Sequence, residues 1–303
     1  MNHNGVNSLN FSPETGKLIL TTGDGGSAYD PFNLSQDIME IAGKIIEIDV
    51  NNNTFINNPP IVTRFDELPA TVQRNLSVMA KGVRNIPGIS FQRYYDQYIK
   101  YLGNVGQNLI ESIFSFTDYV PIPVTEITQK RGANEKDFIN LGWRGWEGDF
   151  PTPIIRPCPT NSSLDEKTIA YFQEAVDTAA KRILPLTCYY HDDSRSDKFS
   201  GTALTGVQAY MGTSIPDLRG AIVFIDFARR DLSPARGVLA YTKVRTVCKQ
   251  NDYSIINTNY NFGSQPAFYT SLGTNSTQTR LYLGVYSSPN VTNFNQGTVF
   301  EIL

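Results

Sequence analysis

Apolar and polar residues alternate in short runs along most of this chain, a pattern typical of half-buried β-strands. The runs come in sets of three and are rich in β-branched and aromatic residues. The first strands of the sets are expected at Val6–Phe11, Gly88–Phe91, Gly206–Met211 and Ala267–Leu272. The second strands are expected at Lys17–Thr22, Tyr98–Gly103, Ala221–Phe227 and Arg280–Tyr286. The third strands are expected at Lys44–Val50, Glu111–Phe116, Gly237–Val244 and Thr298–Leu303. Repeated antiparallel units of this kind predict an all-β protein with the blades of a propeller.

The longest interval between sets, about residues 118 to 202, has room for another blade and contains one helical pattern, Leu164–Ile183. Ser163 and Glu166 form a capping box at its start, and Pro185 follows its end. Apolar residues repeat on one face, at Ile169, Phe172, Val176, Ala180 and Ile183. We predict an inserted helical segment at about residues 164–184 that packs on the rim or flank of the blades. A helix that binds a partner is the alternative.

Composition narrows the classes of function. Charged residues make up 18% of the 303 residues and hydrophobic residues 40%, so a largely disordered chain is excluded. A net charge of −3 gives no basic surface for nucleic acid or an anionic membrane. No apolar run has the length needed to span a bilayer. We therefore expect no nucleic-acid partner and no membrane span.

Three cysteines, Cys158, Cys188 and Cys248, lack the C-x-x-C spacing of a zinc site. One disulfide with a free thiol and three buried thiols are both compatible with them. Met1–Gly5 leads directly into a motif region, so we expect no signal peptide in this chain. Possible N-glycosylation acceptors occur at Asn10, Asn33, Asn52, Asn75, Asn161, Asn275 and Asn290.

Two stretches near the second set carry candidate chemistry. Arg84-Asn85 stands just before the turn signal Ile86-Pro87-Gly88, so both side chains are expected at a loop mouth. Gly103–Gln107 follows a strand and offers backbone carbonyl oxygens of the kind that Ca²⁺ accepts. Two ordinary strand–loop junctions are the alternative interpretation.

Two other stretches are interpreted more plainly. Gly23–Gly26 could suggest a phosphate-binding loop, but no Lys-Ser/Thr pair and no helix follow it. A tight turn that lets another loop approach closely is favoured. His191, Asp192 and Asp193 could form a metal cluster, and a solvated loop is favoured instead.

The motifs, taken in order, resemble those of the glucose/sorbosone dehydrogenase family of soluble quinoproteins. These motifs are His3-Asn-Gly, Thr22-Gly-Asp-Gly-Gly, Gly43-Lys-Ile-Ile-Glu-Ile-Asp, Gly82-Val-Arg-Asn-Ile-Pro-Gly, Gly103-Asn-Val-Gly-Gln-Asn, Asn140-Leu-Gly-Trp and Glu147-Gly. Members of this family are six-bladed β-propellers that use pyrroloquinoline quinone and Ca²⁺, and hedgehog-interacting-protein-like sequences share the fold. The resemblance implies a single propeller domain over residues 1–303. It also implies that the substrate is a sugar or another small alcohol.

The resemblance also implies roles for individual residues. His3 matches the general base that takes the proton of the anomeric hydroxyl while a hydride leaves for the quinone. Arg84 matches the arginine that polarises the quinone oxygen, and Asn85 matches a hydrogen-bond donor to the same edge.

Further positions match the metal and cofactor contacts of the family. Gly106 and Gln107 stand where backbone carbonyls hold Ca²⁺, and Glu111 matches an acidic position tied to a neighbouring Ca²⁺ site. Thr205 matches another cofactor contact.

The sequence also departs from the family pattern. Pyrroloquinoline quinone has three carboxylates, so its pocket is expected to supply several cations. Asn259 and Asn261 stand where glucose-oxidising members carry two arginines, and the lysine expected near Ala235–Gly237 is absent. Three nearby arginines could substitute for it, namely Arg229, Arg230 and Arg236.

The start of the chain departs from the pattern as well. Asn2 replaces the acid that usually precedes the catalytic histidine. The blades that the family places before His3 are not found in this sequence, so the ring is expected to be incomplete, or to be closed by a second chain or by residues outside these 303. Two hypotheses follow, a quinone-dependent aldose dehydrogenase and a catalytically eroded propeller that acts as a binding or structural module.

Overall fold

The computed structural model describes residues 4–51, 61–117, 120–129, 138–152, 182–243, 251–288 and 295–303. Two compact units contain them. Unit 1 comprises Met1–Ile86 and Thr117–Leu184, and unit 2 comprises Pro87–Phe116 and Pro185–Leu303. The prediction of one domain over residues 1–303 concerns how these units are placed, and it stays a prediction.

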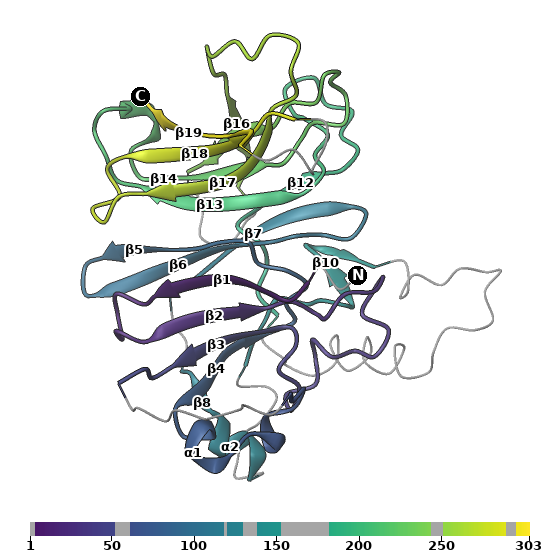
Figure 1. The fold of residues 1–303 in the computed structure, drawn as a ribbon, viewed down its shortest axis with the longest axis vertical. Helices are drawn as coiled ribbons and strands as arrows, with labels where there is room; N and C mark the ends of the chain where they lie inside the picture. The colour runs from purple at the N-terminus through teal and green to yellow at the C-terminus, as the bar shows by residue number, and fades with distance from the viewer. Residues whose placement is uncertain are drawn as a thin grey trace, which may run out of the picture. The chain divides into compact units, whose positions relative to one another are not determined.

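Unit 1 is built on one sheet (Figure 1). Four strands pair antiparallel in chain order, namely β1 (Val6–Phe11), β2 (Leu18–Thr22), β3 (Lys44–Ile48) and β4 (Leu76–Lys81). Two short strands, β8 (Ile122–Pro123) and β9 (Ile139–Asn140), both pair with β4. The strands β10 (Trp146–Glu147) and β11 (Phe150–Pro151) form a separate hairpin.

Short helices close one end of unit 1. They are η1 (Phe65–Glu67), α1 (Ala70–Gln73) and α2 (Val124–Thr128). The helices α1 and α2 lie together beside β8 (Figure 1), and α2 also contacts β4 and η1. A hydrophobic core lies between these helices and the sheet, formed by Ile46, Phe65, Val78, Ile122, Val124, Ile127 and Phe138.

Unit 2 contains three antiparallel sheets. The first is β5 (Ile89–Tyr94), β6 (Gln97–Asn104), β7 (Ile110–Phe116) and β12 (Thr187–Tyr190). The second is β13 (Leu204–Tyr210), β14 (Ala221–Asp226), β15 (Val238–Thr242) and β16 (Tyr253–Ile256). The third is β17 (Phe268–Thr274), β18 (Leu281–Tyr286) and β19 (Gly297–Ile302), and η3 (Pro216–Leu218) precedes β14.

The three sheets of unit 2 are stacked (Figure 1), because β13 contacts β5 and β6 of the first sheet and β17 of the third. Two cores fill the spaces between them. One includes Tyr101, Ile113, Tyr189, Leu204, Val207 and Phe224. The other includes Ile225, Leu239, Tyr269, Leu272, Leu281 and Leu283. The repeated blades expected from the alternating pattern are therefore present.

Each strand of the predicted sets is confirmed, with end points that differ by a few residues. The outer strands β4, β12 and β16 were not predicted. The strands β12 and β16 are four residues long, too short for a clear period-2 pattern. The chain also runs through unit 1 between β7 and β12, so sequence spacing does not connect these neighbours.

Most of the helical segment predicted at about residues 164–184 lies outside the described residues. Its predicted end at Ile183 is wrong. Arg182 forms an isolated β-bridge with Asn140, and the Ile183 N–H donates to the Asn140 carbonyl at 3.0 Å. Extended backbone paired in this way cannot continue a helix.

Candidate functional site

Several motif loops of unit 1 meet at the carboxylate of Asp24. This residue follows β2 and is 1% exposed. Its Oδ1 accepts hydrogen bonds from Asn4 Nδ2 at 2.8 Å and from the Gly26 N–H at 3.0 Å. Its Oδ2 accepts one from Trp143 Nε1 at 2.8 Å. The segment before β1, the turn after β2 and the loop after β9 therefore share one buried acid.

Glycine permits this close approach. A Cβ atom on Gly23 would lie 2.4 Å from the backbone oxygen of Asn4, well inside contact distance. Gly25 has a φ of +86° and donates its N–H to the same oxygen at 3.1 Å. The predicted tight turn that admits another loop is confirmed.

Arg84 belongs to the same cluster. It follows β4 and is 6% exposed. Its Cζ lies 5.7 Å from the centroid of the Trp143 ring, within the range of a cation–π contact. Its carbonyl accepts the Asp24 N–H at 3.0 Å. The guanidinium is thus a fixed cation beside a buried carboxylate.

Electrostatics at Asp24 follow from these neighbours. Burial raises the pKa of the Asp24 carboxyl above its usual value. The hydrogen bonds from Asn4, Gly26 and Trp143 and the charge of Arg84 oppose that effect without cancelling it. The Asp24 carboxyl is therefore buried within the electric field of a permanent positive charge.

Asn85 and His3 complete the list of candidates in unit 1. Asn85 is half-buried, and its Oδ1 accepts a hydrogen bond from the Asn7 side chain on β1. Asn85 and Arg84 therefore lie close to the strand that follows the His3 motif. His3 itself lies outside the described residues, and its predicted role as a base stays a prediction.

A buried lysine, Lys44, holds in place the segment that contacts the Trp143 loop. Lys44 is 0% exposed, and its burial, together with the charge of Lys81, lowers its pKa to about 7. Its ammonium group donates to the carbonyls of Leu34 (3.0 Å), Ser35 (3.2 Å) and Ala42 (2.7 Å). This fixes the segment that carries Gln36, which donates to the carbonyl of Trp143. The sequence pattern gave no sign of this support.

In unit 2, Glu111 on β7 is the centre of a second buried cluster and is 0% exposed. Its Oε1 lies 2.6 Å from His191 Nε2. Its Oε2 accepts the N–H groups of Gly106 at 3.2 Å and of Leu204 at 3.1 Å. Arg230 Nη2 lies 3.3 Å from His191 Nδ1. Because arginine can only donate, Nδ1 is the acceptor and Nε2 carries the proton that faces Glu111.

The Glu111 carboxylate is engaged within the protein, and its role beside a Ca²⁺ site stays a prediction. Both of its oxygens already accept hydrogen bonds from the protein. Within the described residues no group of three or more His, Cys, Asp or Glu side chains could hold a metal ion. The carbonyls of Gly106 and Gln107 as Ca²⁺ ligands stay a prediction.

His191 was expected in a solvated loop, and that expectation is wrong, because the side chain is 3% exposed. It directly follows β12, which pairs with β7 so that Tyr189 lies opposite Glu111. No local pattern could have found a pair separated by 80 positions in the chain.

Thr205, at the start of β13, donates its hydroxyl to the Tyr269 carbonyl at 2.7 Å. Asn259 and Asn261, which replace the family's arginines, are exposed. The three arginines considered as substitutes have partners within unit 2. Arg229 pairs with Asp231 at 2.5 Å, Arg230 contacts His191, and Arg236 donates to the carbonyls of Ala235, Gly263 and Gln265. Among the described residues, Arg84 and Asn85 have donors of the kind that the reactive edge of a quinone would require, whereas these three arginines of unit 2 are engaged elsewhere.

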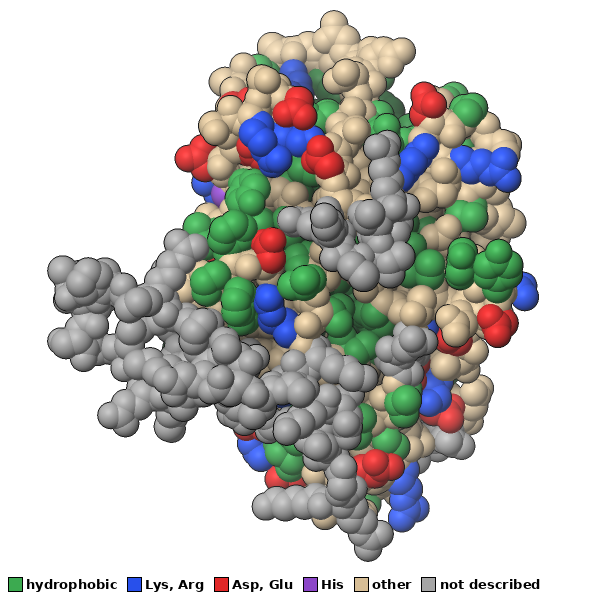
Figure 2. Space-filling model, turned by 180° about the vertical axis from the view of Figure 1, so that it is seen from behind, with side chains coloured by type: hydrophobic (Ala, Val, Ile, Leu, Met, Phe, Trp, Pro, Cys, Tyr) green, Lys and Arg blue, Asp and Glu red, His purple; other side chains and the backbone are tan. Residues whose placement is uncertain are grey.

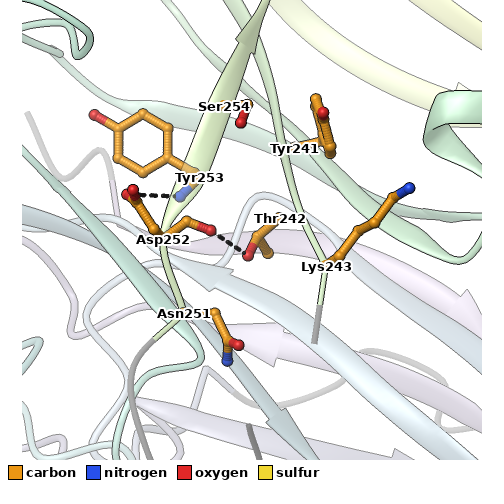
Figure 3. Close-up of a pocket in the computed structure, with 7 residues that line it drawn as sticks. All are labelled: Tyr241, Thr242, Lys243, Asn251, Asp252, Tyr253 and Ser254. Carbon is orange, nitrogen blue, oxygen red and sulfur yellow. Dashed lines mark hydrogen bonds between the residues drawn. The ribbon is translucent and has the colours of Figure 1, made fainter. Parts of the chain in front are cut away.

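A small polar pocket of about 120 Å³ lies at the end of the β15–β16 hairpin (Figure 3). It is lined by Tyr241, Thr242, Lys243, Asn251, Asp252, Tyr253 and Ser254. The Thr242 hydroxyl donates to the Asp252 carbonyl at 2.8 Å, which closes the hairpin end. This pocket contains none of the candidate site residues.

The surface carries charge of both signs. On the face shown in Figure 2, acidic and basic side chains are interspersed among the described residues, without an extended field of one sign. Cys188 is buried, and its Sγ lies 3.5 Å from Ser112 Oγ. Within the described part of the chain, no helix has the length and apolar character needed to cross a membrane.

Comparisons with known proteins bear on this geometry. No family model matches the chain. The chain is 25% identical over 232 residues to the HIPL2 protein of Arabidopsis thaliana, which covers 71% of this chain and 27% of that protein. It is 26% identical over 225 residues to the HIPL1 protein of the same plant, with the same coverage. The chain thus spans about a quarter of the length of these curated relatives.

A solved structure of a glucose dehydrogenase has a similar fold. The TM-score is 0.54 at 13% sequence identity, and the match covers 98% of this chain and 63% of that chain. Likeness at this level of identity concerns the fold, which is the all-β propeller of the sugar dehydrogenases. The matches in sequence and in structure agree with the resemblance found in the motifs: the chain is similar to the HIPL proteins and shares the fold of the glucose dehydrogenase.

Proposed function

We propose that this chain is the propeller of a sugar dehydrogenase that oxidises an aldose or a related alcohol. The observation that carries the proposal is the buried cluster of Asn4, Asp24, Arg84 and Trp143, which joins four separate segments of unit 1. A buried acid next to a buried cation is costly to maintain for architecture alone. Perturbed carboxyl groups of this kind concentrate at functional sites.

The proposed roles use the chemistry of these groups. His3 precedes Asn4 and takes the proton of the substrate hydroxyl on its imidazole nitrogen. Asp24 balances the positive charge that His3 acquires, in place of the acid missing at Asn2. Arg84 supplies a fixed positive charge where negative charge develops.

Cofactor binding is part of the proposal. Bound pyrroloquinoline quinone would supply the hydride acceptor, and Arg84 and Asn85 of unit 1 would contact its reactive edge. The role of Thr205, in unit 2, as a cofactor contact stays a prediction. The carbonyls of Gly106 and Gln107 would hold Ca²⁺. Because the described arginines of unit 2 have other partners, weak quinone affinity is expected.

A binding module of the same fold is the second candidate function. The engaged side chains of Arg229, Arg230 and Arg236 and the exposed Asn259 and Asn261 favour it. Under this hypothesis the cluster at Asp24 has only a structural role. In either case a second chain that completes the propeller stays a proposal.

Quinone titration separates the two candidates. Purified protein in millimolar Ca²⁺ is titrated with pyrroloquinoline quinone, and binding is followed by calorimetry. We expect saturable binding that Arg84→Gln weakens by about 10–100-fold, since a hydrogen bond to a charged group is worth about 1.5–3 kcal/mol. Arg93→Gln, a change of an exposed arginine on β5, is the matched control and should bind like wild type. Wild-type protein that takes up no quinone would contradict the dehydrogenase proposal and favour the binding module.

A further inference from the structure

Glu111 joins two segments that the proposed function uses separately. One of its oxygens, Oε2, accepts the N–H of Gly106 and the N–H of Leu204. Gly106 belongs to the proposed Ca²⁺ loop, and Leu204 directly precedes Thr205, the proposed cofactor contact. A single carboxylate oxygen therefore fixes the distance between these two parts of the site.

A second buried carboxylate continues the same arrangement. Asp226 at the end of β14 is 1% exposed, and its Oδ2 accepts the N–H groups of Thr202 and Ala203, both at 3.0 Å. Three successive N–H groups before Thr205 thus end on two buried carboxylates, since Leu204 donates to Glu111. The segment that carries Thr205 has its backbone donors fixed from within the core.

Both carboxylates are in turn held by β12 and the residue after it. The Tyr189 hydroxyl donates to Asp226 Oδ2 at 2.8 Å, and His191 Nε2 faces Glu111 Oε1 at 2.6 Å. Residues two apart on an extended segment point to the same side, so Tyr189 on β12 and His191 directly after it supply the two donors from one continuous segment. The two donors act on different acids, which allows their effects to be separated.

His191 controls the orientation of Glu111. Its Nε2–H occupies Oε1, which turns Oε2 toward Gly106 and Leu204. If that donor is removed, the buried Oε1 loses its hydrogen bond from the ring. Because an unsatisfied buried acceptor is unfavourable, the carboxylate is expected to rotate toward other donors. Rotation would release the two N–H groups together.

We propose that His191 is a positioning residue, which through Glu111 holds the Gly106–Gln107 loop and Thr205 in register for a Ca²⁺-bound cofactor. The ligand in this statement rests on the proposed function, whereas the positioning of the two backbone segments does not. Residues that orient the immediate surroundings of a metal typically change its affinity by 10–100-fold when mutated.

The test compares three variants of the whole chain. His191→Phe keeps a ring and removes the donor, His191→Gln restores a donor, and Tyr189→Phe removes the neighbouring donor to Asp226. Amide hydrogen exchange at Gly106 and Leu204 is measured without metal, and Ca²⁺ affinity is measured by calorimetry. In His191→Phe we expect both amides to exchange about 10-fold faster or more, and Ca²⁺ to bind about 10–100-fold more weakly. His191→Gln should recover most of both effects, and Tyr189→Phe should leave Gly106 and Leu204 unchanged.

The outcomes separate this inference from the proposed function. Wild-type protein that binds no Ca²⁺, with faster exchange at both amides in His191→Phe, supports the positioning role and contradicts the proposed metal site. Unchanged exchange in His191→Phe overturns the inference, and so does equal acceleration in Tyr189→Phe. If His191→Phe does not fold, His191→Met carries the test, because it also removes the donor to Oε1 while filling the space of the ring, and it should release the same two amides.

Discussion

Replacing Asp24 by Asn tests the buried cluster of unit 1 most sharply. The carboxylate accepts from Asn4 and Gly26 on one oxygen and from the Trp143 indole on the other. An amide has one oxygen and one NH₂ group, so it must place a donor against a donor on one side. Turning the NH₂ group toward Trp143 costs least, since only one hydrogen bond is lost.

The magnitude follows from the bond that is lost and the charge that is removed. A hydrogen bond to a charged group is worth about 1.5–3 kcal/mol. Burial raises the pKa of Asp24, so removing its charge relieves part of that penalty. We expect Asp24→Asn to lower the free energy of unfolding by about 1–2 kcal/mol.

Urea denaturation and tryptophan fluorescence measure the effect. The chain has two tryptophans, so a Trp146→Phe background isolates Trp143. Asp24→Asn should lower the urea midpoint and change the emission of Trp143, whose indole N–H loses its charged partner. A double-mutant cycle with Trp143→Phe should give a coupling of about 1–2 kcal/mol. An unchanged midpoint and emission, or a coupling near zero, would refute the assignment of this hydrogen bond.

Three further results are expected. Burial and the charge of Glu111 raise the pKa of Asp226 from 3.8 to about 7, so the native state binds this proton more tightly. Stability should therefore fall by up to about 4 kcal/mol between pH 4 and 7, and Asp226→Asn should abolish this slope in pH-dependent urea melts. The pH dependence of stability that arises from Lys44 has the opposite sign, because folding lowers its pKa from 10.5 to about 7. Stability should therefore be lost as the pH falls from 10.5 toward 7, and Lys44→Met should remove this loss. Gly23→Ala should cost about 1–3 kcal/mol in thermal melts because its Cβ meets Asn4 backbone at 2.4 Å, whereas Gly5→Ala, with nothing within 4 Å, should cost less.

Period-2 alternation was enough to predict the first, second and third strands of each set. Val6–Phe11 was predicted with its observed bounds, because apolar and polar residues alternate from Leu9 to Phe11 and a turn follows at once. The strand β12 could not be predicted, because its four residues pair with β7 across an excursion of the chain through unit 1. Pairing over such a distance depends on tertiary packing, which leaves no local pattern.

The candidate site, too, could be predicted only in part from the sequence. Arg84 was predicted at a loop mouth, and the structure shows in addition that it is buried beside Trp143. Asp24 appeared in the sequence only as part of a glycine-rich turn, because its partners Asn4 and Trp143 lie far from it in the chain. The pairing of Glu111 with His191 was missed for the same reason.

Sugar oxidation by the reconstituted protein tests the central proposal most directly. Protein loaded with pyrroloquinoline quinone and Ca²⁺ is assayed against a panel of aldoses and simple alcohols with an artificial electron acceptor. We predict aldose-dependent turnover that requires both additions and falls about 10²–10⁴-fold in His3→Ala, with the thermal melt nearly unchanged. The absence of turnover with every sugar in the wild-type protein, or equal turnover in His3→Ala, would contradict the assignment of this propeller as a sugar dehydrogenase with His3 as its base.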